Sequence, residues 1–88
     1  MRHRYLEVTF RKGKPLAAYL YLPRTGRVTV RSTRDVGDGL KVDFDERGVP
    51  VGVEITAPSA VSVEALNAVL AKLGVGTIDA AELAPIAA

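Results

Sequence analysis

The side chains that could perform chemistry are few in this sequence. His3 is the only histidine and there is no cysteine, so one chain cannot assemble a histidine-based triad, a multi-histidine metal site or a thiolate site. The serines at 32, 59 and 62 have no nearby base that would activate them as nucleophiles. We therefore expect no catalytic residue, no cofactor and no metal, and a protein that is not an enzyme.

The densest group of acids is Asp43, Asp45 and Glu46, at a predicted hairpin. Carboxylate oxygens suit a hard cation, but this spacing lacks the ligand number of a calcium loop, and we interpret the three acids as solvated turn residues. A weaker hypothesis is a small enzyme whose site forms across a dimer interface from Asp43, Asp45 and Glu54. That site would need at least one carboxylate with a strongly raised pKa.

The elements that must position these residues are mostly strands. Apolar and polar residues alternate in five segments separated by turns rich in glycine, at residues 4–10, 16–22, 27–36, 40–45 and 49–55. The alternation places Leu6, Val8 and Phe10 on one face of the first strand, and Val28 and Val30 point inward from the third. In the fifth, Val49, Val51, Val53 and Ile55 share a face. Because Pro50 has no backbone N–H to donate, the start of that strand should lie at an edge or face away from its neighbour.

From Ser62 the apolar period changes to that of a helix. Val63, Leu66, Leu70 and Leu73 form one stripe, Ser62 can cap the first amides, and Gly74 can end the helix. We expect this helix to cover the apolar face of the sheet, and a further helical turn over 77–83 to be capped by Thr77. The prediction is an α+β fold, a five-stranded antiparallel β-meander with a C-terminal helix packed on one sheet face. Residues 1–57 form the meander, and residues 58–88 are a helical segment of the same single domain.

The composition is that of an ordinary globular protein. The chain has 88 residues, of which 48% are hydrophobic and 25% are charged. Its apolar stretches are far shorter than the roughly 20 residues of a membrane span, and the N-terminus lacks the features of a secretory signal. We therefore expect a cytoplasmic protein without a membrane partner. Because a chain of this size has a small core, a homo-oligomer or a small protein partner is expected to contribute to its stability.

Charge is divided unevenly along the chain. Residues 1–34 hold nine Arg or Lys residues against one acid, and the other 54 residues hold three basic and nine acidic side chains. On a meander, the third strand would place its arginines beside the tyrosines of the second strand. One interpretation is that these arginines pair across strands with Glu7, Asp43, Asp45 and Glu54. The other is a binding face, for which the candidate residues are Tyr19, Tyr21, Arg27, Arg31, Asp43, Asp45 and Glu54.

Gly52 and Glu54 lie on the polar face of the fifth strand. The missing side chain at Gly52 leaves room for a neighbouring ring such as Phe or Tyr, and we interpret this glycine as a packing residue. Glu54 is expected to pair with an arginine of the basic half, which would make it structural.

Several motifs together resemble a known family. They are Leu-Tyr-Leu at 20–22, the run at 33–40 with its Gly-Asp-Gly turn, Asp-Phe-Asp at 43–45, and Val-Pro-Val-Gly-Val-Glu-Ile at 49–55. The order is similar to that in the family catalogued as domain of unknown function 2283 (DUF2283), over roughly residues 5–57. The resemblance implies a small bacterial or archaeal β-sheet domain without an established activity, often encoded beside another small gene, which has prompted toxin and antitoxin proposals.

The sequence departs from this family in its first hairpin. Arg11 and Ala18 stand where the family has aspartates, so an acidic site there is missing. Asp43, Asp45 and Glu54 are the acids of this chain that match acidic positions of the family's pattern. The leading hypothesis is a non-enzymatic protein-interaction module, antitoxin-like or a homo-oligomer, that uses its polar sheet face or a sheet edge. The alternative is an RNA- or DNA-binding protein that uses Arg24, Arg27, Arg31 and Arg34 with Tyr19 and Tyr21.

Overall fold

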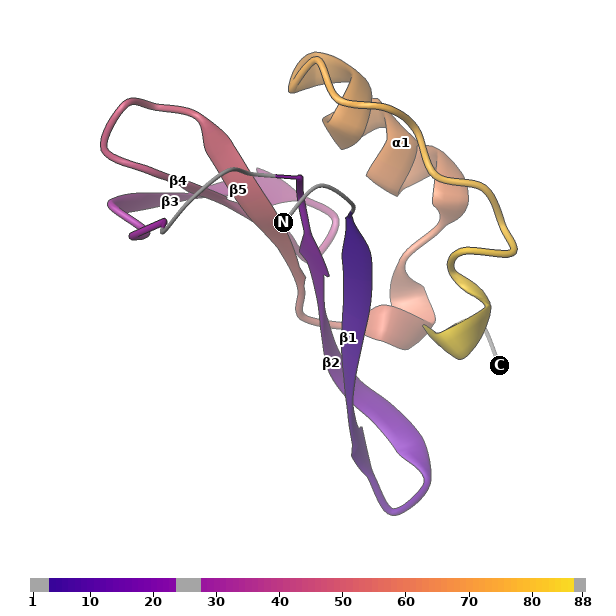
Figure 1. Cartoon of the computed structure of the whole chain (residues 1–88). Coiled ribbons are helices and arrows are strands. Elements are labelled where there is room, and N and C mark those ends of the chain that lie inside the picture. Colours follow the sequence, from indigo (N-terminus) through magenta and orange to yellow (C-terminus); the bar gives the residue numbers. More distant parts are fainter. Residues whose placement is uncertain (1–3, 24–27, 87–88) are drawn as a thin grey trace.

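The computed structural model describes residues 4–23 and 28–86. Its strands are β1 (Tyr5–Arg11), β2 (Lys14–Tyr21), β3 (Ser32–Gly37), β4 (Leu40–Phe44) and β5 (Pro50–Ile55), and its helix is α1 (Val63–Lys72). Short 3-10 helices occupy Pro58–Ala60 and Ala84–Ile86. The strands form one antiparallel sheet with α1 on one side (Figure 1). The predicted α+β class, with five antiparallel strands and a C-terminal helix, is confirmed.

The order of strands across the sheet is β1-β2-β5-β4-β3. The hairpins β1–β2, β3–β4 and β4–β5 join consecutive strands, as in a meander, but β2 pairs with β5, with Tyr19 opposite Glu54. The prediction that the third strand lies beside the second is therefore wrong, and β3 forms the far edge. β5 offers β2 a more apolar neighbour than β3 does, with Leu20 opposite Val53.

The core lies between the sheet and the C-terminal part of the chain. Fully buried side chains come from every strand except the two edges, and they meet Leu66 and Leu70 of α1 and Ile78 and Leu83 beyond it. Ser62 caps α1 by accepting the backbone N–H of Ala65 at 3.0 Å. The predicted helical stripe is confirmed, because Leu66 and Leu70 are buried and the other two members are half-buried against the core.

Three residues that we expected to face inward are exposed. Phe10 is 55% exposed, since the β1–β2 hairpin extends beyond the rest of the sheet (Figure 1). Val30 is 49% exposed because β3 begins only at Ser32 and lies at an edge. Val49 is exposed because it belongs to the hairpin turn before β5. Pro50 begins β5 at an irregularity in the β4–β5 register, so the ladder does not require its missing N–H there.

Residues 77–83 do not form the helix that we predicted with Thr77 as its cap. The backbone makes turns with bonds three residues apart, and Asp79 provides the cap by accepting the N–H of Glu82 at 2.9 Å. Asn67 of α1 holds this segment, because its amide group donates to the Ile78 carbonyl and accepts the Ile78 N–H, at 2.9 and 2.7 Å. Arg4 holds the other side through the carbonyls of residues 76 and 77 and an ion pair with Glu82 at 3.2 Å. These tertiary bonds replace a helical ladder.

Within residues 4–23 and 28–86, no helix has the length and apolar character needed to cross a membrane.

Candidate interaction face

The face of the sheet turned away from α1, here called the open face, carries most of the predicted site residues. Its side chains alternate with those of the core, so each strand contributes every second residue. In order across the sheet, its members are Tyr5, Glu7, Tyr21, Tyr19, Gly52, Glu54, Asp43, Lys41, Thr33 and Asp35.

Three tyrosines pack together on the open face and form what we call the tyrosine cluster. The rings of Tyr5 and Tyr21 are stacked, with centroids 4.5 Å apart, and Tyr19 meets Tyr21 edge to face at 4.7 Å. The Tyr21 hydroxyl donates to Glu7 Oε1 at 3.3 Å. Tyr5 is 49% exposed although it is stacked, so the cluster presents aromatic surface in a fixed arrangement.

Tyr19 links the cluster to the middle of the sheet. Its ring crosses β5 over Gly52, and its hydroxyl donates to Asp43 Oδ2 at 2.7 Å. The Thr33 hydroxyl of β3 donates to the other carboxylate oxygen of Asp43 at 2.5 Å. A Cβ atom at residue 52 would overlap the Tyr19 ring. The prediction that Gly52 makes room for a neighbouring ring is confirmed.

The structure brings four of the seven predicted interaction residues together on this face: Tyr19, Tyr21, Asp43 and Glu54. Arg31 lies just before β3 at the far edge, where its backbone N–H donates to the Phe44 carbonyl at 2.8 Å. Arg27 lies outside the described residues. The arginines therefore do not lie beside the tyrosines in the way that a sequential meander requires.

Asp45, the remaining residue, lies in the β4–β5 turn and has a buried side chain. Its Oδ1 accepts the backbone N–H groups of Arg47 and Val49, at 2.8 and 2.9 Å. The hydrogen bond from Val49 is the main reason why the pKa of Asp45 is lowered; partial burial opposes it, and the Arg47 backbone and charge reinforce it. Asp45 thus stabilises the turn and takes no part in the open face.

The three acids considered for a dimer-interface enzyme are not brought to one place. Asp43 is held by two hydroxyl groups, Glu54 lies opposite Tyr19 and Lys41, and Asp45 is in the turn. The lowered pKa of Asp45 is also opposite to the raised pKa that such a site needs. Among the described residues, no three His, Cys, Asp or Glu side chains are grouped so that they could hold a metal ion.

The cross-strand arginine pairs that we considered are absent from the described part of the chain. Its two ion pairs join Arg4 to Glu82 and, at 3.8 Å, Arg47 to Asp45. Neither involves Glu54, so the expected pairing of Glu54 with an arginine is not confirmed.

Tyr5 is the member of the cluster that the sequence analysis did not single out. Its contact with Tyr21 depends on the register shift between Thr9 and Phe10, which alternation within one strand does not reveal. Thr33 was also not among the predicted site residues, and its bond to Asp43 follows from the β3–β4 pairing.

The fold defines a small α+β protein with an antiparallel sheet that is covered by a helix on one side. Residues 17–59, just under half of the chain, match the family model described as "Protein of unknown function (DUF2283)". The match begins within β2 and extends past β5, and it includes the Gly-Asp-Gly turn, Asp43, Gly52 and Glu54. It confirms the resemblance drawn from the motifs. No curated protein and no solved structure matches the chain.

Proposed function

We propose that this protein is a non-enzymatic, cytoplasmic protein-interaction module that binds its partner through the open face. The observation that supports this most directly is the tyrosine cluster, whose rings are fixed by stacking and by the bond from Tyr19 to Asp43. Tyrosine is enriched in protein interfaces because it offers a large contact area for little loss of conformational entropy. A cluster whose rings are already fixed loses still less conformational entropy on binding, which favours affinity.

The surroundings of the cluster also suit a protein partner. Glu7, Lys41, Glu54 and Asp35 lie around and beyond the rings on the open face, which gives an aromatic centre with a polar border of both charges. The partner is a second copy of this chain or another small protein. By its resemblance to DUF2283, the module takes the antitoxin-like role in such a pair.

The alternative of RNA or DNA binding is less well supported by the geometry. Asp43 and Glu54 lie between the tyrosines and the β3 edge, where they would repel phosphate groups. Arg34 lies on the other side of the sheet, with its guanidinium 5.4 Å from the centre of the Phe44 ring. A single surface that combines Arg31 and Arg34 with Tyr19 and Tyr21 is therefore not formed by the described residues.

The proposal is tested by the mass of the protein, gently affinity-purified from its source cells, using light scattering with absorbance at two wavelengths. We expect a mass above that of one chain, with protein-like absorbance. Tyr5→Ser should reduce the mass to that of one chain, whereas Leu16→Ser, at a residue of similar exposure outside the cluster, should not. A single-chain mass at micromolar concentration would refute the proposal. Absorbance typical of nucleic acid, with binding that falls steeply with salt, would support the alternative.

A further inference from the structure

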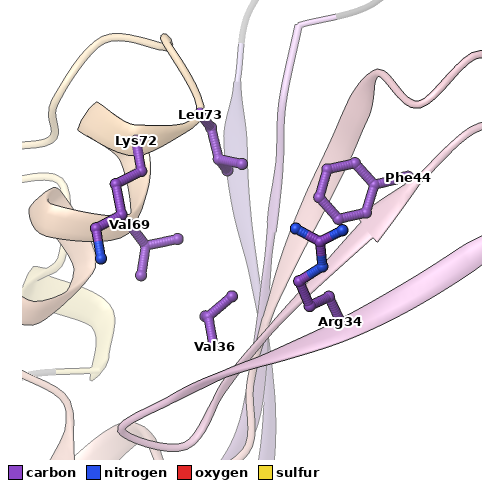
Figure 2. Close-up of a pocket in the computed structure, with 6 residues that line it drawn as sticks. All are labelled: Arg34, Val36, Phe44, Val69, Lys72 and Leu73. Carbon is purple, nitrogen blue, oxygen red and sulfur yellow. The ribbon is translucent and has the colours of Figure 1, made fainter.

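A groove runs between β3 and α1 on the side of the sheet opposite the tyrosine cluster. It has a volume of about 330 Å³ and is lined by Arg34, Val36, Phe44, Val69, Lys72 and Leu73. Figure 2 shows Val69, Lys72 and Leu73 of α1 on one side of this space and Arg34, Val36 and Phe44 of the two strands on the other. Four of the six lining residues are apolar, and one cation lies on each side.

The groove exists because the helix packs against the inner strands and leaves the edge strand uncovered. Every residue of β3 is exposed, including Val36 at 38%, and no β3 side chain belongs to the buried core. Val69 and Leu73 of α1 are only half-buried for the same reason. Apolar side chains on both walls therefore remain in contact with water, and an apolar group placed between them would remove that surface from water.

No strand among residues 4–23 and 28–86 pairs with the outer edge of β3. The backbone N–H of Thr56, just after β5, donates to the carbonyl of Gly39, just before β4. The backbone groups of residues 39, 41 and 43 therefore point toward β5, and those of Val42 point toward β3. Val42 is paired with Arg34, so the N–H and C=O groups of Thr33 and Asp35 point outward. An extended chain could add to the sheet there as a sixth strand.

The charge of the groove selects the kind of chain that fits. Arg34 and Lys72 have no ion-pair partner among the described residues, and the Arg34 guanidinium lies over the Phe44 ring at 5.4 Å. A carboxylate held between two cations gains charge-assisted hydrogen bonds, whereas a second cation would be repelled.

We propose that this groove binds an extended segment of a partner protein, which pairs with the free edge of β3, inserts an apolar side chain between Val36 and Val69, and places a carboxylate at Arg34 and Lys72. Backbone pairing supplies affinity, and the apolar and acidic side chains supply specificity. This site goes beyond the proposed function, because it lies on the opposite side of the sheet and uses none of the tyrosines.

The test uses the full chain and three fluorescein-labelled peptides of eight residues. All have serine at every second position, and the positions between hold valine and the test residue in turn, so that both point to the same face of the extended peptide. The test residue is glutamate, lysine or glutamine. In fluorescence anisotropy at low salt we expect the glutamate peptide to bind at least about tenfold more tightly than the lysine peptide, with glutamine between them. The double variant Arg34→Glu, Lys72→Glu should reverse this preference. The control Arg11→Glu, Lys14→Glu makes the same change in net charge at the exposed β1–β2 hairpin. This control should keep the preference for the glutamate peptide.

Three outcomes would overturn the proposal. They are the absence of binding by all three peptides, equal binding of the three, and a preference that the groove variant leaves unchanged. A two-chain mass that falls to one chain in Val36→Lys would also overturn it, since the occupant would then be a second copy. Tyr5→Ser should leave peptide binding unchanged, so failure at this groove can be told apart from failure at the open face.

Discussion

Tyr19 crosses β5 because residue 52 has no side chain. An alanine there would overlap the ring and displace the Tyr19 hydroxyl from Asp43. We expect Gly52→Ala to lower the free energy of unfolding by about 1–3 kcal/mol, the usual effect of overpacking, although alanine is intrinsically better than glycine in a strand. Urea denaturation measures this change. In a Tyr19→Ala background the same substitution should be neutral or stabilising, and an equal loss in both backgrounds would show that the ring is not the cause.

Asp45 makes the stability of the fold depend on acid pH. Its pKa is lower in the folded chain than its ordinary value of 3.8, so the unfolded chain binds the proton more readily. The stabilisation is present above about pH 4 and is lost as the pH falls through the folded pKa. We expect the free energy of unfolding to decline below about pH 4 in the natural protein, and less steeply in Asp45→Asn. Glu46→Gln, which removes a charge from the same turn and leaves the Asp45 bonds intact, is the matched control; identical pH slopes in all three proteins would contradict the assignment.

Two of the hairpins need a shift in strand register so that the apolar side chains of both strands lie on the same face of the sheet. The turn at Lys12 and Gly13 and the turn at Asp38 and Gly39 each have two residues with positive φ, which is typical of tight type I′ hairpins. A two-residue turn pairs an even-numbered residue of one strand with an odd-numbered residue of the other. Without a register shift, each core-facing residue would therefore lie opposite a polar residue. The register shifts between Thr9 and Phe10 and between Asp35 and Gly37 restore the match.

The edge strand β3 is expected to open more readily than the central strands. It has no buried side chain and bonds to β4 alone, whereas Val53 of β5 is fully buried between two neighbours. Native-state hydrogen exchange should therefore show protection at the Arg34 amide at least about tenfold lower than at the Val53 amide. Equal protection would mean that β3 opens only when the whole molecule unfolds. Adding the glutamate peptide should slow exchange in β3 if the groove is occupied.

The segment after α1, at residues 75–86, completes the core of the molecule. Ile78 and Leu83 are buried there, and Asn67 and Arg4 hold the segment in place. A chain that ends at Gly74 should lose about 3–6 kcal/mol of unfolding free energy, from about 1.5–3 kcal/mol for each of the two buried side chains. Chemical denaturation followed by circular dichroism measures this loss. The variants Ile78→Ala and Leu83→Ala should each show part of it, and an unchanged midpoint in the shortened chain would contradict this role.

Much of the fold could be predicted from local patterns. Alternation located the strands, the helical period located α1, and Ser62 and Gly74 marked its ends to within a residue. Gly52 was recognised as a packing position because a glycine inside a strand implies the close approach of another group. These features depend on a few neighbouring residues, whose spacing is visible in the sequence.

The approximate positions of the strands and the helix, and the apolar face of most of them, follow from backbone geometry over a few residues and are therefore visible in the sequence. Three features are not visible there: β5 separates β2 from β3, Phe10 and Val30 lie outside the core, and Asn67 holds residues 77–83. Those outcomes depend on contacts between residues far apart in the chain. The fit of the Tyr19 ring over Gly52 is such a contact, and the alternation within one strand does not reveal which strand lies beside it.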